Sequence, residues 1–235
     1  MATFDDPLFF ADEFTGKVRL FPLPNLVLFP HVMQPLHIFE QRYRDLLEEA
    51  VAHDGLIAMA ALAPGWERNY EGRPALFPMA CLGRIIAHCR LDDGTYNVLV
   101  LGLRRVRLVR ELNSPRRFRE AEVELCDDVC SACSPARRRA LRKELHEALL
   151  QVLPTLPEAC EQLDQLLEND VSLGMLTDVI GYLLDIDLRH KQSLLAEVNV
   201  LRRARLLLRH LWEVAEHLAT VQSPALLFPP QFSTN

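Results

Sequence analysis

The stretch LFPLPNLVLFPHVMQPLHIFEQRYRDLL, residues 20–47, decides the fold, because it sets prolines among apolar residues and then turns into a helical pattern. Proline fixes φ and has no N–H to donate, so each one ends or bends an extended piece. The stretch predicts short strands that turn corners and bury most of the apolar residues, with the corner at residues 29–32 reaching the surface. The prolines are Pro22, Pro24, Pro30 and Pro35, and the apolar residues expected to face the core are Leu20, Phe21, Leu26, Val27, Leu28, Phe29, Leu36 and Ile38.

Alternating patterns follow in the first half of the chain. Residues 81–91 place apolar side chains at odd positions, a two-residue period typical of a half-buried strand. The turn DDG and a second strand-like run complete a predicted β-hairpin over residues 82–112. Residues 119–126 alternate again, and residues 40–55 carry a helical period that ends at a glycine. Several strands and one helix predict a small barrel or compact sheet.

The pattern becomes helical from Ser134 onward. Ser134 can cap a helix with Pro135 at its first position, and a leucine-rich stripe follows. We predict an α+β protein in which a β-rich pseudo-barrel, residues 1–133, is followed by an α-helical bundle and a C-terminal tail, residues 134–235. Further helices are expected at about residues 158–167, 172–184, 188–197 and 198–220.

The composition is that of a folded globular protein, with 49% hydrophobic and 25% charged residues. The formal net charge is −6, so no general attraction to nucleic acid or to an anionic membrane is expected. The N-terminus carries acids where a signal peptide needs basic residues, and no apolar run reaches the ~18 residues of a membrane span. We expect a cytoplasmic protein with no membrane partner, whose six cysteines are reduced.

Catalytic motifs are missing from the sequence. It contains no G-x-x-x-x-G-K-[ST] loop for nucleotide phosphates, and no H-E-x-x-H, G-x-S-x-G or strand-associated G-x-G-x-x-G pattern. Lys191 and Ser193 are two residues apart in a predicted helix and therefore point in different directions, which argues against a Ser/Lys nucleophile pair. We predict that the chain is not an enzyme and needs no cofactor.

The segment CDDVCSAC raises a metal-site hypothesis. Cys126, Cys130 and Cys133 have the C-x3-C-x2-C spacing that holds an iron–sulfur cluster in radical enzymes, and three thiolates can also form part of a zinc site. The segment follows the last predicted strand and precedes a helical bundle, rather than lying in an α/β barrel. Zinc needs a fourth ligand, for which His146 is one candidate. We expect a flexible inter-domain linker with no bound metal.

Arginines gather in three groups, and their guanidinium forks match phosphate groups well. They fall on both faces of the predicted strands, as on a solvated sheet edge, and the glutamates of the next strand stand nearby. Nucleic acid is therefore not the expected partner, and RNA binding is kept as the alternative function. The groups lie in residues 104–110, 116–119 and 137–139.

The proline-rich stretch closely resembles the opening of the N-terminal, substrate-binding domain of Lon-type ATP-dependent proteases. LGRIIAHCRLDDGTYNVLVLGLRRVRLVREL, residues 82–112, resembles that family's hairpin, and DVIGYLLDIDLRHKQSLLAEVNVLRRARLLLRHL, residues 178–211, resembles its closing helices. The resemblance implies a PUA-like β pseudo-barrel followed by an α-helical subdomain. It includes neither the ATPase nor the Ser/Lys protease of Lon, so the chain is similar to the stand-alone bacterial form of this domain.

The resemblance also implies the partner. We expect a non-catalytic module that binds polypeptide, in particular unfolded or apolar segments, and that works with a separate protease or chaperone system. Two places are expected to hold the polypeptide: the groove between barrel and bundle, and the loop over residues 63–78 with its large aromatic side chains. The candidate contact residues are Phe29, His31, Val32, Trp66 and Tyr70.

Overall fold

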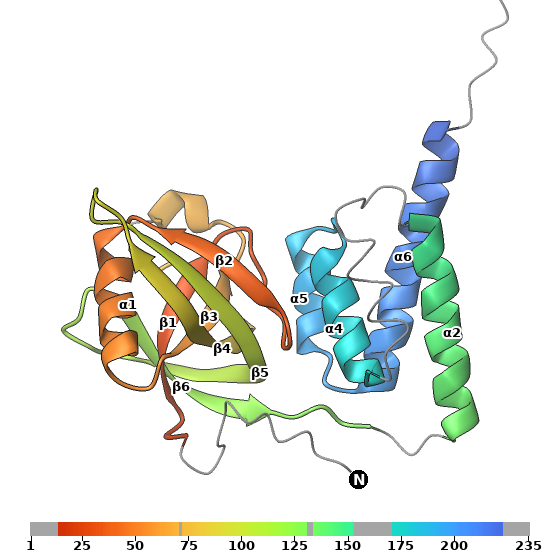
Figure 1. Ribbon diagram of the computed structural model, residues 1–235, viewed down its shortest axis with the longest axis horizontal. Coiled ribbons are helices and arrows are strands. Elements are labelled where there is room, and N and C mark those ends of the chain that lie inside the picture. Colours follow the sequence, from red (N-terminus) through yellow and green to blue (C-terminus); the bar gives the residue numbers. More distant parts are fainter. Residues whose placement is uncertain (1–13, 71, 131–133, 153–170, 223–235) are drawn as a thin grey trace, which may run out of the picture.

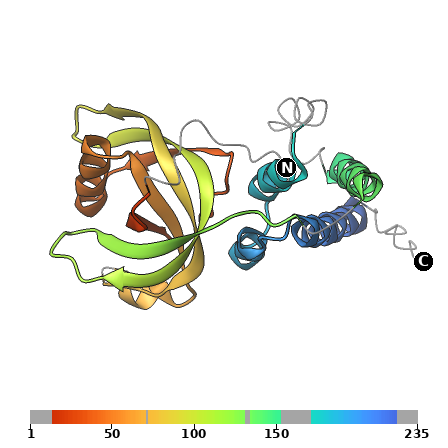
Figure 2. The same cartoon turned by 90° about the horizontal axis from the view of Figure 1, so that it is seen from below.

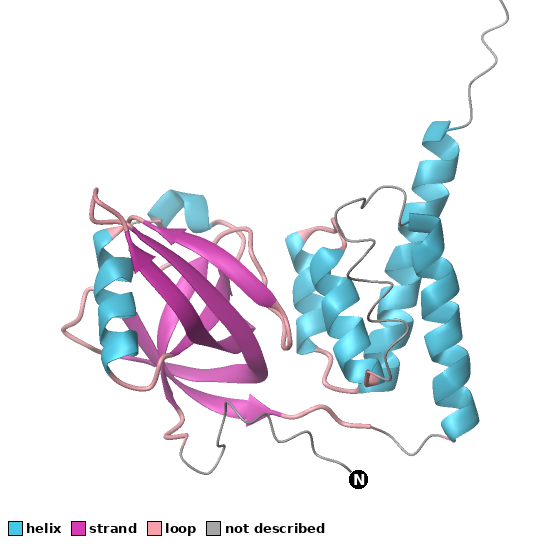
Figure 3. Ribbon diagram, in the orientation of Figure 1, coloured by secondary structure: helices cyan, strands magenta, loops and turns pink. Residues whose placement is uncertain are grey.

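Strands occupy the first part of the chain and helices the second, and the two parts lie side by side in the computed structural model (Figure 1, Figure 3). The structure describes residues 14–70, 72–130, 134–152 and 171–222. The α+β class is therefore confirmed. The strands are β1 Lys17–Leu23, β2 Met33–Ile38, β3 Leu56–Leu62, β4 Leu76–Arg90, β5 Tyr96–Leu112 and β6 Arg119–Cys126. The helices are α1 Gln41–Ala52, the short 3-10 helix η2 Trp66–Asn69, α2 Pro135–Val152, α4 Leu173–Leu183, α5 Leu188–Ala196 and α6 Val200–Gln222.

The described strands form one sheet that curls back on itself. Its order is β2-β5-β4-β3-β1-β6, and β6 also pairs with the second half of β5. β1 runs parallel to β3, and the other neighbouring strands are antiparallel. Figure 2 shows the curved sheet beside the helices. The predicted hairpin is β4 and β5, although β4 begins at Leu76, before the expected start at residue 82.

The proline-rich stretch forms β1, a corner and β2, and most of its apolar side chains face the core as predicted. The corner differs from the expectation, because Phe29 and Val32 are buried and His31 alone of these candidate contacts is exposed. The cause is the close approach of β5: Gly102 accepts the His31 N–H and donates to the Val32 carbonyl, both at 2.8 Å. A Cβ on Gly102 would lie 2.0 Å from the Phe29 carbonyl oxygen, so only glycine permits this contact.

Polar side chains cap the two central helices of the bundle. The Ser172 hydroxyl accepts the Met175 N–H at the start of α4, and the Asp187 carboxylate accepts the His190 N–H at the start of α5. Both helices therefore begin within a residue of the expected position. The helix expected at residues 158–167 lies outside the described residues.

The segment after β6 is held by main-chain hydrogen bonds. The Val129 N–H donates to the Val198 carbonyl at 2.8 Å, and the Val129 carbonyl accepts the Val200 N–H at 3.1 Å. This pairing keeps residues 198–199 extended, so α6 begins at Val200 rather than at residue 198. It also corrects the expectation of a flexible linker for the described residues of that segment.

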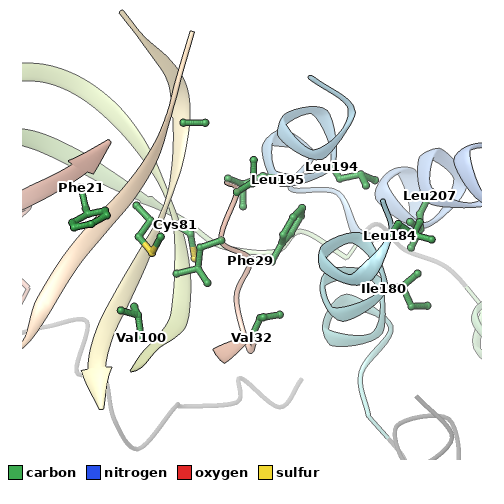
Figure 4. Close-up of a cluster of buried hydrophobic side chains, with 14 of the residues drawn as sticks. Phe21, Phe29, Val32, Cys81, Val100, Ile180, Leu184, Leu194, Leu195 and Leu207 are labelled. Atoms are coloured by element: carbon green, nitrogen blue, oxygen red, sulfur yellow. The ribbon is translucent and has the colours of Figure 1, made fainter. Parts of the chain in front are cut away.

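Two clusters of buried apolar side chains form the core. The smaller lies among the strands and includes Leu20, Ala58 and Leu82. The larger runs from α1 through the proline corner to the helices, and Figure 4 shows Phe29 between the sheet and helices α4 and α5. The helices thus pack directly on the sheet. The described strands end at Cys126 and α2 begins at Pro135, while a boundary between folding units at residues 133/134 stays a prediction.

Candidate functional site

A cleft of about 390 Å³ lies between the sheet and α5, where a groove between barrel and bundle was expected. One wall comes from the loop after β3 and from the start of β4. The other wall is one face of α5, because residues spaced by three and four positions lie on the same side of a helix. The sheet wall consists of Pro64, Phe77, Pro78 and Met79, and the helix wall consists of Arg189, Gln192, Ser193 and Ala196.

The cleft is largely apolar, and its polar groups come from α5. The Ser193 hydroxyl donates to the Arg189 carbonyl at 2.9 Å. Gln192 is only 5% exposed, yet its side-chain amide has no hydrogen-bond partner among the described residues. The amide is not among the fully enclosed polar atoms that lack a partner, so it has access to solvent at the cleft. The cleft is therefore suited to a ligand that has both apolar surface and hydrogen-bonding groups.

The opposite face of α5 fixes the orientation of the helix. Leu194 and Leu195 are fully buried on that face. The Arg105 Nε of β5 also donates to the Leu195 carbonyl at 2.9 Å. These contacts hold α5 against the sheet and thereby set the width of the cleft.

Four charged side chains meet where sheet and helices join, and we call them the junction cluster: Arg105 of β5, Asp128 after β6, Asp178 of α4 and Arg203 of α6. Arg105, Asp178 and Arg203 are 3%, 1% and 0% exposed. The Arg105 Nη1 donates to Asp178 Oδ2 at 3.0 Å and lies 3.3 Å from Asp128 Oδ1. The Arg203 Nη1 donates to Asp128 Oδ1 at 2.9 Å. The formal charges of the cluster cancel.

Neutral groups complete the hydrogen bonding of the junction cluster. The Arg203 Nε donates to the Thr177 hydroxyl at 3.0 Å, and its Nη1 donates to the Glu197 carbonyl at 2.8 Å. Burial alone would lower the pKa of Arg105, but the Asp178 carboxylate outweighs burial and raises it. Burial alone would raise the pKa of Asp128, but the hydrogen bonds and charge of Arg203 outweigh it and lower that pKa. Together with the Leu195 and Glu197 carbonyls, the four side chains link β5 and the segment after β6 to α4, α5 and α6.

The loop with Trp66 and Tyr70 is a small ordered unit. The two rings meet edge to face, with centroids 5.6 Å apart. The Tyr70 hydroxyl donates to Glu40 Oε1 at 2.8 Å, and the Arg42 guanidinium lies 4.9 Å from the centroid of the Tyr70 ring. Burial and the hydrogen bond to Glu40 raise the pKa of Tyr70. Both rings are partly exposed, and Pro64, near the start of the same loop, lines the cleft.

The structure thus places the five candidate contacts in three different surroundings. Trp66 and Tyr70 pack against each other at the surface. Phe29 and Val32 offer no surface to a partner in this conformation, because they fill the space between sheet and helices. His31 is exposed, and its charge contributes to the low pKa of Asp128, which places it near the junction cluster.

Sequence reasoning missed the junction cluster and Gln192. Asp178 lies in LGMLTDVIGYL, where it is the only charged residue of an apolar helix, and Arg203 falls among the leucines that face the core of α6. A charge at a position that helical periodicity assigns to the core is the signal that could have found both. For Gln192, helical periodicity predicts only that the residue is buried. It cannot predict that Gln192 lines a cleft, because the residues of the sheet wall are distant in the sequence.

The cysteine segment shows no metal site in the part that is described. Cys126 is partly exposed and Cys130 is exposed, both as free thiols, and Cys133 lies outside the described residues. Among the described residues, no group of three or more histidine, cysteine or acidic side chains is placed to hold a metal ion. The trio as a whole therefore remains untested.

None of the helices within the described ranges is both long and apolar enough to cross a bilayer.

Comparison with known proteins finds similarity to Lon proteases. The family of the ATP-dependent protease La (LON) substrate-binding domain matches residues 17–213. Lon protease 2 of Myxococcus xanthus is 28% identical over 197 residues, which are 84% of this chain and 24% of that protein. Lon protease 2 of Syntrophobacter fumaroxidans is 32% identical over 145 residues, which are 60% of this chain and 18% of that protein. The chain thus spans about a quarter or less of the length of these relatives.

Two solved structures share the fold. The N-terminal domain of the Mycobacterium avium complex Lon protease superposes with a TM-score of 0.66 at 21% identity, covering 84% of this chain and 98% of that one. The Lon N-terminal domain protein from Xanthomonas campestris gives a TM-score of 0.60 at 24% identity, covering 82% of this chain and 97% of that one. With the match over residues 17–213, these similarities confirm the resemblance found in the sequence: the chain belongs to the family of the Lon substrate-binding domain.

Proposed function

We propose that this chain binds polypeptide segments with exposed apolar side chains, that it does not alter them chemically, and that the cleft beside α5 is where they bind. The observation that carries the proposal is the composition of the cleft: apolar Phe77 and Met79 and the unpartnered amide of Gln192 line one hollow of about 390 Å³. That volume lies within the range of about 300–1,000 Å³ that is usual for ligand pockets. The substrate-binding role of the family supports the same class of ligand.

The client is held by its side chains rather than by strand addition. β2 lies at one end of the strand order and pairs only with β5 among the described strands. Pro35 in β2 has no N–H, so this edge lacks a donor in the middle of its row. The groups that line the cleft suit a client that places an apolar side chain in it and forms a main-chain hydrogen bond with Gln192.

Trp66 and Tyr70 form a second contact area for a client that extends beyond the cleft. Pro64 lines the cleft, and η2 begins at Trp66, two residues later. The Tyr70 hydroxyl is engaged with Glu40, so the exposed parts of the two rings offer stacking surface.

Lys191 and Ser193 are the residues that most resemble a Ser/Lys catalytic pair, and their hydrogen bonds support a non-catalytic role. The Lys191 Nζ donates to the Tyr182 carbonyl at 2.8 Å, whereas the Ser193 hydroxyl donates to the Arg189 carbonyl. Because the two groups have different partners, lysine does not act as a base for the serine hydroxyl.

The alternative, RNA binding, receives little support from the arginines of the barrel. Most of the arginines in the groups at residues 104–110 and 116–119 have a carboxylate partner, so little unbalanced positive charge is left for phosphates. The exposed or partly exposed pairs are Arg104–Asp127, Arg107–Glu124, Arg110–Glu122, Arg116–Glu120 and Arg117–Asp45, and the buried Arg119 pairs with Glu111.

In the cell, the proposed module acts in the cytoplasm and presents its clients to a separate protease or chaperone system. The relatives that match this chain are named Lon proteases, and the match corresponds to about a quarter of their length. A binding step that precedes proteolysis is therefore the role that we assign.

The experiment measures fluorescence anisotropy of labelled apolar peptides with the purified chain. Ala196→Arg places a long charged side chain at the cleft and should weaken binding about tenfold or more. Ala140→Arg, at an exposed helical position of α2 away from the cleft, is the matched control and should bind normally. Trp66→Ala with Tyr70→Ala should reduce affinity only for peptides longer than the cleft.

Two outcomes would contradict the proposal. Equal affinities of the Ala196→Arg and Ala140→Arg variants would move the site elsewhere. Binding of single-stranded RNA that falls steeply with salt, with no peptide binding, would favour the alternative function.

A further inference from the structure

The helix wall of the cleft carries hydrogen-bonding groups without partners in the protein. Arg189 is exposed, lines the cleft and has no ion-pair partner among the described residues. Gln192, one turn further along α5, is 95% buried and has a free amide that can donate two hydrogen bonds and accept others. The Ser193 hydroxyl already donates to the Arg189 carbonyl, so its oxygen is left as an acceptor.

These groups differ from the other arginines and amides near the junction. Arg105 and Arg203 are saturated by carboxylates and carbonyls, and the buried Gln34 amide bonds to the Tyr182 hydroxyl and the Pro35 carbonyl. The Gln34 amide thus finds its partners within the protein, whereas Arg189 and Gln192 line the cleft with side-chain groups that are available to a ligand. Open polar groups beside apolar walls indicate a ligand that brings its own partners.

The order of the groups fits the end of a polypeptide chain. A guanidinium pairs with both oxygens of a carboxylate, and an amide pairs with the N–H and C=O of a peptide group. Arg189 and Gln192 are three residues apart on a helix, so their Cβ atoms are about 5–6 Å apart. A last residue presents a carboxylate, a peptide group and an apolar side chain within that distance. With an internal aspartate or glutamate, the carboxylate is on a side chain, so the apolar side chain for Phe77 and Met79 has to come from a neighbouring residue.

We infer that the cleft binds the carboxyl-terminal end of a polypeptide whose last side chain is apolar, with the terminal carboxylate on Arg189, the last peptide group on Gln192 and the side chain between Phe77, Met79 and Ala196. This inference rests on the proposed function and narrows its ligand. On this inference, the module recognises apolar C-terminal ends of polypeptides rather than apolar segments in general.

The test compares three peptides of the same length by fluorescence anisotropy, each labelled at its N-terminus. The first ends in Leu-Phe-Leu with a free carboxylate, and the second has the same sequence with an amidated end. The third is amidated and carries an internal aspartate beside the apolar residues. We expect the first to bind at least about tenfold more tightly than the other two, because only it carries a carboxylate and an apolar side chain on the same residue.

Variants assign the contacts. Arg189→Gln should lower the affinity for the free-acid peptide to that of the amidated peptide and leave the latter unchanged. Arg205→Gln, an exposed arginine of α6 without an ion pair among the described residues, is the matched control and should change neither. Gln192→Leu should weaken the binding of both peptides. Circular dichroism of each variant confirms that the fold is retained.

The outcomes separate the inference from the proposed function. If the free-acid and amidated peptides bind equally, or if Arg189→Gln weakens both alike, the chain-end inference is wrong while cleft binding stands. If the third peptide matches the first, the carboxylate comes from a side chain and the inference is also wrong. If no peptide binds and Ala196→Arg has no effect, the proposed function fails together with it.

Discussion

Arg105 and Arg107 lie two positions apart on β5 and each pairs with a carboxylate, yet their surroundings differ. Arg105 and its partner Asp178 are 3% and 1% exposed, whereas Arg107 and its partner Glu124 are 60% and 55% exposed. Residues two apart on a strand share a face of the sheet, so strand geometry does not separate them. The helices cause the difference in exposure, because α4 and α5 cover Arg105 and leave Arg107 in water.

The comparison shows that the same pair of residue types has two structural roles. In water, an ion pair gains little, because solvent already stabilises both charges. At the junction Arg105, Asp178 and Arg203 have lost their water, so these charges depend on one another, and removing one leaves an uncompensated charge in the interior. The junction cluster therefore fixes where the helices stand on the sheet, and with them the helix wall of the cleft.

Asp178→Asn should have the largest effect on stability. It leaves Arg105 and Arg203 with one carboxylate between them, and breaking a buried pair typically lowers the free energy of unfolding by about 3–5 kcal/mol. Urea denaturation followed by circular dichroism measures the loss. Asp127→Asn, whose side chain is 77% exposed, is the control. Equal losses in the two variants would show that the junction is not shielded from water.

Gly102→Ala should be the next most damaging change. The new Cβ would stand 2.0 Å from the Phe29 carbonyl oxygen, and a main-chain atom cannot move aside as a side chain can. Overpacking of this kind costs about 3 kcal/mol, which urea denaturation resolves. Val109→Ala, at an exposed position of the same strand, should be nearly neutral. A stable Gly102→Ala protein would mean that the proline corner can separate from β5.

Asp128→Asn should give a smaller loss that depends on pH. The pKa of Asp128 is lowered in the folded chain, so its carboxylate stabilises the fold at pH values above its unfolded pKa of about 3.9. That contribution disappears as pH falls through the lower, folded pKa. Urea denaturation at pH 7, 5, 4 and 3 should show a constant difference from the native chain down to about pH 4–5 and a shrinking one below. A difference that does not change with pH would contradict the pairing with Arg203.

Glu124→Gln should have the smallest effect. The carboxylate raises the pKa of Arg107, but both side chains are largely in water and Arg107 remains charged without it. We expect a melting temperature that differs from that of the native chain by no more than the scatter of repeat scans. A clear drop would place this surface pair in the same class as the junction cluster and remove the contrast between them.

Much of the fold could be predicted from local patterns. The two-residue period predicted β4, β5 and β6, the helical spacing predicted α4 and α5, and the prolines predicted the corner between β1 and β2. The burial of Phe29 in that corner was the main error about the surface. It depends on Gly102 of β5, which is distant in the sequence and allows the main chains to touch.

The candidate site was less predictable than the fold. The aromatic pair Trp66 and Tyr70 was recognised by size, and the groove was expected where barrel and bundle meet. The residues that line the groove were not foreseen, because Phe77 and Gln192 come together only when α5 packs on β4.

The sequence by itself determined most of the elements and their order along the chain, because these depend on periodicity, prolines and caps that act over a few residues. Its resemblance to known sequences indicated the family. Only the tertiary structure decided which charges are buried and where a ligand has room. Arg105 pairs with Asp178, which is 73 positions away in the sequence. Only the packing of α4 and α5 on the sheet buries Arg105 and leaves Arg107, on the same strand, in water.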